Sequence, residues 1–202
     1  APARPPATSP IYLTPPGRPR EEDLRAAAAV LKGAQKPAML VGAGARGARE
    51  EVLAVAAALG APVVKTLPGK AVIPDDSPYA VGGIGLLGTR PGEELMESCD
   101  TLLMVGTNFP YTKHLPSPGA ARVVQIEADP TRAGVRLPTE VPIVGDAKES
   151  LAALLPLLDG GPATDHLESY QKAMASWRDD MTALEDAGRS PIAPQYVVGL
   201  ND

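Results

Sequence analysis

The residues AMLVGAGARG at positions 38–47 decide the fold of this 202-residue chain. They begin with a short continuous apolar run, which is typical of a buried strand. Gly42, Gly44 and Gly47 follow with the spacing G-x-G-x-x-G, and a helix is expected over about residues 48–59. Glycines here permit a tight turn and a close backbone approach, and the helix N-terminus offers a positive dipole end to a diphosphate. The stretch predicts a nucleotide-binding strand–helix unit, with a plain glycine-rich turn as the alternative.

The same alternation of strand and helix continues along the chain. Short apolar runs that predict buried strands occur at 62–65, 101–105, 122–126 and 141–144. Two-sided apolar strands that alternate with helices are typical of a parallel sheet covered on both faces. The pattern therefore predicts an α/β fold: a three-layer, Rossmann-like parallel sheet flanked by helices. Pro142 cannot donate to a ladder of hydrogen bonds, so the last strand is expected at a sheet edge.

Composition excludes several functional classes. With 44% hydrophobic but only 3% aromatic residues, the chain can bury one core built from Ala, Val and Leu. Its apolar runs fall short of the ~18 residues of a membrane span, so a soluble, cytoplasmic protein is expected. A net charge of −5 without a basic stripe argues against a nucleic-acid partner.

Few residues are available for metal binding or catalysis. The lone Cys99 precludes an internal disulfide and fits a reducing compartment. His114 and His166 lack partners at metal-ligand spacing, so we expect no metal site in this chain. The usual nucleophile–base pairs are nearly absent as well, and no catalytic residue is assigned.

The two ends of the chain differ from its middle. Seven prolines in residues 1–19 predict an extended inter-domain linker, because proline fixes φ and lacks an amide proton. Residues 20–160 are expected to form the nucleotide-binding domain, and residues 161–190 a helix that leads out of it. Residues 191–202 then begin a new apolar stretch, which we interpret as the start of a missing C-terminal domain.

The helix expected over 161–190 has a clear pattern. Large apolar residues recur at alternating spacings of three and four, the period of one helix face. Asp165 with Glu168 matches a capping pattern at its start, and Gly188 is a typical residue beyond a helix end. We expect its apolar face to pack on the sheet or on a neighbouring domain.

The ribose-binding acid of an NAD site is missing from its usual place. Such sites carry a carboxylate at the end of the second strand. Here that strand ends in Lys65 and Thr66. A later strand ends in Glu127, which becomes the candidate for a ribose contact, with a solvated strand end or a salt bridge as the alternative.

Two further loops follow strand ends, where ligands collect in open α/β sheets. The first, GGIGLLG at 82–88, is too rich in glycine for a helix and too apolar for a free surface loop. The second, GTNFPY at 106–111, holds the only Phe of the chain beside a Tyr, an amide and a hydroxyl. Such side chains can line a flat heteroaromatic ring. The alternative is an ordinary turn whose aromatic residues fill the rim of the core.

The metal motif of thiamine-diphosphate enzymes does not occur in the chain. That motif is G-D-G followed downstream by paired asparagines, and the run GDA at 145–147 does not match it. A G-x-x-x-x-G-K-[ST] phosphate loop is missing too, because Lys70 is followed by Ala71. The diphosphate–magnesium site is therefore not expected in these residues.

An ordered series of short motifs runs the length of the chain. Its members are GAGARG (42–47), LPGK (67–70), YAVG (79–82), IGLLG (84–88), GTNFPY (106–111), QIEADP (125–130) and VGD (144–146). In this order they resemble the middle domain of the thiamine-diphosphate-dependent pyruvate oxidase and quinone-dependent pyruvate dehydrogenase family. Each motif is weak alone, and the series, above all the Asn-Phe-Pro-Tyr loop, is specific.

The resemblance implies a six-stranded parallel sheet that binds FAD in an extended pose. Segments matching 84–87 and 107–111 contact the flavin in that family, and position 127 holds an acid at the adenosine end. The FAD-contacting residues implied for this chain are Gly42, Gly44, Ala45, Arg46, Ile84, Gly85, Leu86, Leu87, Thr107, Asn108, Phe109, Pro110, Tyr111, Glu127 and Asp146.

The resemblance also implies partners. Thiamine diphosphate and Mg²⁺ would be bound by the N- and C-terminal domains of a parent oxidoreductase acting on a pyruvate-type 2-oxo acid. That parent would be homo-oligomeric and can be peripheral to a membrane, and the present domain would be inactive on its own.

Two positions depart from the family, and alternatives remain. Position 127 is usually Asp rather than Glu, and Pro68 stands where relatives of the quinone-dependent enzyme carry Arg. The first alternative is the middle domain of an acetolactate-synthase-like or decarboxylase-like enzyme with structural FAD, ADP or no ligand. The others are an NAD-dependent oxidoreductase, disfavoured by the missing acid, and an interaction domain with an empty cleft.

Overall fold

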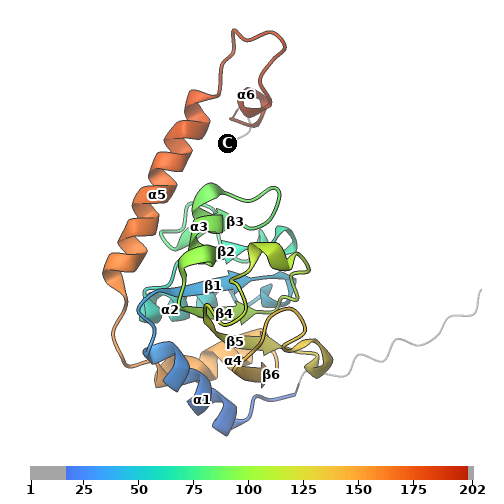
Figure 1. Cartoon of the computed structure of the whole chain (residues 1–202), viewed down its shortest axis with the longest axis vertical. Helices are drawn as coiled ribbons and strands as arrows, with labels where there is room; N and C mark the ends of the chain where they lie inside the picture. Colours follow the sequence, from blue (N-terminus) through green and yellow to red (C-terminus); the bar gives the residue numbers. More distant parts are fainter. Residues whose placement is uncertain (1–16, 200–202) are drawn as a thin grey trace, which may run out of the picture.

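A computed structural model describes residues 17–199 and contains a six-stranded, wholly parallel sheet in the order β3-β2-β1-β4-β5-β6 (Figure 1). The strands are β1 (Pro37–Val41), β2 (Val63–Lys65), β3 (Ala80–Gly83), β4 (Thr101–Val105), β5 (Arg122–Glu127) and β6 (Val141–Val144). The predicted α/β, Rossmann-like fold is confirmed. Residues 1–16 of the expected linker and 200–202 of the expected next domain lie outside the described residues.

Helices cover both faces of the sheet, because alternate strand residues point to opposite layers. Met39 and Val41 of β1 pack into a cluster with one set of helices, α1, α2 and α4, whereas Ala38 and Leu40 pack into a second cluster with α3 and α5. The helices are α1 (Glu21–Lys32), α2 (Arg49–Leu59), α3 (Arg90–Ser98), α4 (Ala147–Leu154), α5 (Thr164–Ala183) and α6 (Pro194–Gly199). This arrangement gives the three layers that the sequence predicts.

Strand β3 (Ala80–Gly83) was not predicted from the apolar runs, and the glycine-rich loop was expected to begin at residue 82. Gly82 ends up within the strand at φ +80°, where a Cβ would lie 2.3 Å from Thr89 Cγ2. Thr89 Oγ1 donates to Val81 O (2.7 Å) and accepts from Gly92 N (3.2 Å) as the N-cap of α3. The expected extent of the loop was therefore wrong, while the six strands implied by the family resemblance are confirmed.

Pro142 lies where its missing amide proton is tolerated. Its strand, β6, is at one edge of the sheet and pairs only with β5, with Pro142 opposite Gln125. The side chain of Pro142 is exposed. The edge position predicted from this residue is confirmed.

Helix α5 runs along one side of the domain and projects beyond the sheet, and a loop from its far end leads to α6 (Figure 1). Its start does not use the predicted Asp165 cap: the N-cap is Ala163, whose amide donates to Leu59 O (3.0 Å) at the end of α2. Its end is Ala183, well before Gly188. Both terminal predictions were wrong, because contact with α2, rather than local capping, places the first turn.

Candidate functional site

The loops that follow β1, β4 and β5 meet at one edge of the sheet. All strands are parallel, so their carboxyl ends share this edge, and the chain leaves β1 toward β2 and later returns to β4 on the other side. The carboxyl edge at such a reversal is where open α/β sheets bind ligands. It lies on the right of Figure 1.

Glycines after β1 and β4 allow their two loops to touch. A Cβ on Gly42 would lie 2.5 Å from Thr107 Cβ, and one on Gly44 would lie 2.8 Å from Gly106 Cα. Gly106 itself has φ +57°, and its Cβ would meet Gly44 C at 2.4 Å. The loop glycines thus serve the contact between the two loops, whatever else they approach.

The amides of the glycine motif are largely used inside the protein. Gly44 N donates to Gly106 O (2.9 Å), Ala45 N to Gly42 O (3.0 Å) and Arg46 N to Ala43 O (3.2 Å). Helix α2 begins only at Arg49 and places Glu50 and Glu51 in its first turn. Negative side chains already occupy the positive end of this helix, so a diphosphate finds less support here than the motif alone suggests.

Arg46 links the first two strand ends. Its Nε and Nη2 donate to Pro68 O at 3.2 and 2.7 Å. The guanidinium is exposed and carries further N–H groups beyond these two bonds. It can therefore stabilise the loop after β2 and still face an anion at the edge.

The two loops predicted to hold a ring come together at Gly85 and Phe109. A Cβ on Gly85 would lie 3.2 Å from Phe109 Cζ, so a larger residue at this position would crowd the ring. Phe109 is 8% exposed and packs edge-on against Tyr111, with ring centroids 5.5 Å apart. It also lies edge-on to His114, whose Nδ1 is hydrogen-bonded to Glu93 of α3.

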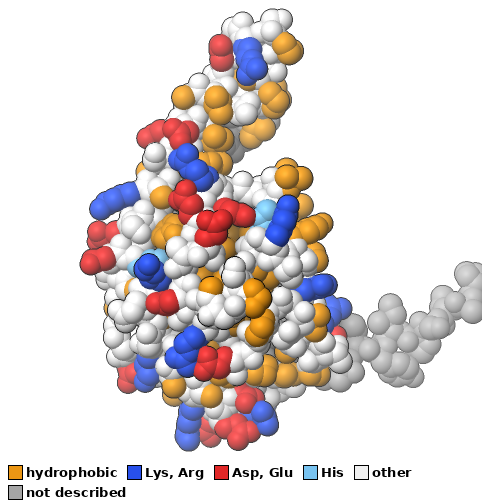
Figure 2. All heavy atoms as spheres, viewed as in Figure 1, with side chains coloured by type: hydrophobic (Ala, Val, Ile, Leu, Met, Phe, Trp, Pro, Cys, Tyr) orange, Lys and Arg blue, Asp and Glu red, His pale blue; other side chains and the backbone are white. Residues whose placement is uncertain are grey.

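Large apolar side chains stand exposed around this contact. Leu86 is 93% exposed, Leu87 81% and Tyr111 62%, whereas Ile84 and Thr107 are buried and Pro110 is exposed. Figure 2 shows hydrophobic side chains gathered on the right of the body, the side of the carboxyl edge in Figure 1. Exposed apolar clusters of this kind mark surfaces that a ligand or another domain covers.

Glu127, Asn108 and Asp146 each already have a partner. Glu127 ends β5, is 9% exposed and accepts from Ala128 N through Oε1 (3.0 Å). Asn108 Oδ1 accepts from Arg136 Nε (3.0 Å). Asp146 Oδ1 accepts from the amides of residues 148 and 149 as the N-cap of α4.

Sequence reasoning missed a buried lysine at the same edge. Lys65 ends β2, is 3% exposed, and donates to Ile73 O (3.1 Å) and to Asp75, which also pairs with Lys70. Burial acts to raise the pKa of Asp75, but the hydrogen bonds and charges of the two lysines outweigh it and lower the pKa. The sequence feature that could have revealed this site is a lysine at the end of an otherwise apolar strand.

The described residues contain neither a metal-binding cluster nor a membrane-spanning helix. No three His, Cys, Asp or Glu side chains in residues 17–199 gather closely enough to hold a metal ion. In the same range, no helix has the length and hydropathy needed to cross a bilayer.

Residues 24–154 match the family model for the thiamine pyrophosphate enzyme, central domain. The chain belongs to this family. The resemblance seen in the sequence is confirmed at the level of the thiamine pyrophosphate enzyme central domain, and the match does not extend it to the pyruvate oxidase family.

Several relatives of this central domain are similar over most of its length. The putative thiamine pyrophosphate-containing protein YdaP of Bacillus subtilis (strain 168) is 36% identical over 95% of this chain and 33% of its own. The acetolactate synthase isozyme 3 large subunit of Escherichia coli (strain K12) is 30% identical over 87% of this chain and 32% of its own. The pyruvate oxidase of Lactiplantibacillus plantarum is 28% identical over 83% of this chain and 28% of its own.

The central domain spans about a third of the length of these relatives. They include more than one kind of thiamine pyrophosphate enzyme, and the pyruvate oxidase is no more similar than the acetolactate synthase. Membership of the family is therefore shown at the level of the central domain.

Proposed function

We propose that this chain is the FAD-binding central domain of a thiamine-diphosphate-dependent oxidase or dehydrogenase that acts on a pyruvate-type 2-oxo acid. The observation that carries the proposal is the contact of Gly85 with Phe109, which joins the two loops expected to hold the flavin. Both loops lie at the carboxyl edge, beside the loop after β1 and the end of β5.

The exposed apolar residues suit the ring end of this cofactor. Leu86, Leu87 and Tyr111 offer uncovered apolar surface next to the Phe109 ring, and burying such surface against a flat ring is favourable. FAD, when bound, supplies electron-accepting chemistry. The protein residues would hold the ring and exclude water from one of its faces.

Polar groups suit the other parts of the cofactor. Glu127 lies at the end of β5 and is assigned to the hydroxyls of the adenosine ribose. Because the amides of the glycine loop are engaged internally, we assign the diphosphate charge to the Arg46 guanidinium, which has N–H groups beyond its bonds to Pro68 O. Asn108 would sit near the ribityl chain, and Asp146 near the adenosine end.

The remaining activity belongs to other parts of the parent enzyme in this proposal. Thiamine diphosphate and Mg²⁺ would be held by its N- and C-terminal domains, in keeping with the share of the relatives that this chain leaves uncovered. The parent would be a cytoplasmic homo-oligomer. The domain by itself would bind cofactor without turning over substrate.

A second function has comparable support from the relatives. The acetolactate synthase of Escherichia coli is 30% identical to this chain. A central domain of an acetolactate-synthase-like or decarboxylase-like enzyme, with structural FAD, ADP or no ligand, is therefore the alternative proposal.

The test is the identity of the bound cofactor. Purified protein is examined for flavin absorbance, and any released nucleotide is identified after denaturation. FAD at ~100 times its dissociation constant is expected to add about 2.7 kcal/mol, which raises the melting temperature by roughly 5–10 °C for a chain of this size. ADP in place of FAD would favour the alternative, and a larger shift with NAD would overturn both proposals.

A further inference from the structure

A cavity lies beside the carboxyl ends of β2 and β3, away from β4 and β5. It has a volume of about 740 Å³ and is bounded on its other side by residues of α5 and α6. Figure 2 shows the notch between the arm formed by α5 and α6 and the body of the domain. Small-molecule sites in proteins have volumes of this order.

Part of the cavity wall is apolar. Met174 and Trp177 of α5 face Ile84 and Leu87 of the loop after β3, and Met181 continues the α5 side. Met174 is buried and Trp177 packs against the cluster beneath it. A wall of this composition fits an aliphatic or aromatic group.

Three cationic side chains line another part of the wall, near Asp75: Lys65, Lys70 and Arg178. Lys65 is almost wholly buried, Lys70 is exposed, and Arg178 extends from α5 toward Asp75. Asp75 connects them: its carboxylate pairs with both lysines, and its carbonyl oxygen accepts from Arg178 Nη2 (2.7 Å). The carboxylates that line the cavity, Asp75 and Glu185, are fewer than the cations.

The cations retain donors for a ligand. Among the described residues, Lys65 Nζ bonds Ile73 O and Asp75, which uses two of its three N–H groups. Lys70 Nζ bonds Asp75 alone, and Arg178 bonds only Asp75 O, so each has further N–H groups. A buried ammonium is costly to desolvate, and an incoming anion would add to the partners that offset this cost.

We propose that this cavity binds a small organic anion, a carboxylate or a phosphate monoester on an apolar body, with Lys65, Lys70 and Arg178 at the anion and Trp177 against the body. The inference goes beyond the proposed FAD function. Of the two loops assigned to the flavin, only the one at 82–88 lines this cavity, through Gly82, Gly83, Ile84 and Leu87. The cation cluster lies outside both loops.

The experiment uses Trp177, the only tryptophan of the chain, as the reporter. Its fluorescence is followed in the full chain, without FAD, during titration with phenylacetate, phenyl phosphate and the uncharged phenylacetamide. We expect a saturable change with at least one anion and a much weaker one with the amide. The tighter anion tells whether the site prefers a carboxylate or a phosphate.

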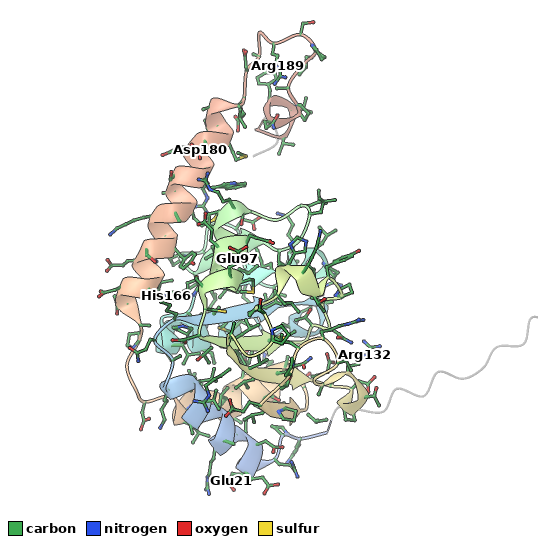
Figure 3. The ribbon with its side chains drawn as sticks, viewed as in Figure 1. Glu21, Glu97, Arg132, His166, Asp180 and Arg189 are labelled. Atoms are coloured by element: carbon green, nitrogen blue, oxygen red, sulfur yellow. The ribbon has the colours of Figure 1, made fainter. Side chains whose placement is uncertain are left out.

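Variants decide whether the cation cluster is responsible. Lys65→Met and Arg178→Gln are each expected to weaken anion binding by roughly tenfold or more, because each removes a charge-assisted hydrogen bond. Arg178 is exposed, so its replacement remains informative if Lys65→Met unfolds the chain. Arg132→Gln is the control, since Arg132 lies on the side of the domain opposite α5 (Figure 3).

Three results would overturn the proposal: no saturable change, equal binding of the amide, or equal losses in Arg132→Gln and Arg178→Gln. Failure of FAD binding would leave these titrations unaffected, because they are made without FAD. The two proposals can therefore fail separately.

Discussion

Replacing Gly106 by Ala tests the contact between the loops after β1 and β4. Gly106 has φ +57°, and a Cβ there would lie 2.4 Å from Gly44 C and 2.6 Å from Ala45 N. Both neighbours are backbone atoms and cannot rotate away. The substitution therefore has to separate the two loops that form the centre of the candidate site.

The expected loss of unfolding free energy in Gly106→Ala has two parts. A left-handed backbone conformation costs a residue with a Cβ about 1–2 kcal/mol. Overpacking adds about 1–3 kcal/mol. Gly134→Ala is the matched control, because Gly134 has φ +74° and its Cβ would meet nothing closer than Thr139 Cβ at 3.9 Å. Only the first cost applies there, so the difference between the two variants is about 1–3 kcal/mol.

The assay is thermal and urea unfolding of both variants, followed by circular dichroism and Trp177 fluorescence. The stated difference corresponds to roughly 2–12 °C in melting temperature for a chain of this size. FAD affinity, measured where both variants are folded, should fall in Gly106→Ala and remain in Gly134→Ala. Equal destabilisation by the two substitutions would show that the loops can move apart freely, and the close packing would then not explain these glycines.

Three further outcomes are expected. In calorimetric titrations, Glu127→Ala should weaken the binding of FAD and of ADP alike, by ~1.5–3 kcal/mol for each charge-assisted hydrogen bond that is lost. Asn108→Ala should weaken the binding of FAD and leave that of ADP unchanged. Equal losses of both ligands in Asn108→Ala would mean that the cofactor runs the other way. Burial, with a contribution from Asp100, raises the pKa of Cys99 to about 12, so a disulfide reagent at pH 8 should label this thiol only after unfolding, and rapid labelling of native protein would contradict its buried position. The chain supplied with thiamine diphosphate, Mg²⁺, FAD and pyruvate should show no turnover, and activity in a homogeneous sample would place the missing metal site in these residues after all.

The motifs of the candidate site could be located from the sequence, but their contacts could not. The spacing of Gly42 and Gly44 predicted a close backbone approach, and the structure shows that the approaching partner is Gly106 of a loop more than sixty residues away. Likewise, the meeting of Gly85 with Phe109 depends on the packing of β3 and β4 loops across the sheet edge. In the sequence, Lys65 was noted only because it stands where an NAD site carries an acid. Its role in the cavity was not predictable, because its partner Asp75 and the α5 wall come from other segments.

The sequence by itself determined the α/β class, five of the six strands (all but β3) and the edge position of β6, since each depends on residues close together in the chain. Tertiary structure decided β3, whose glycines have no strand pattern and are held by Thr89 and by pairing with β2. It also decided where α5 begins, through the bond from Ala163 to Leu59, and which strand-end loops touch. Local propensity and capping act over a few residues, whereas these features arise from contacts between distant segments, and those exist only once the sheet has formed.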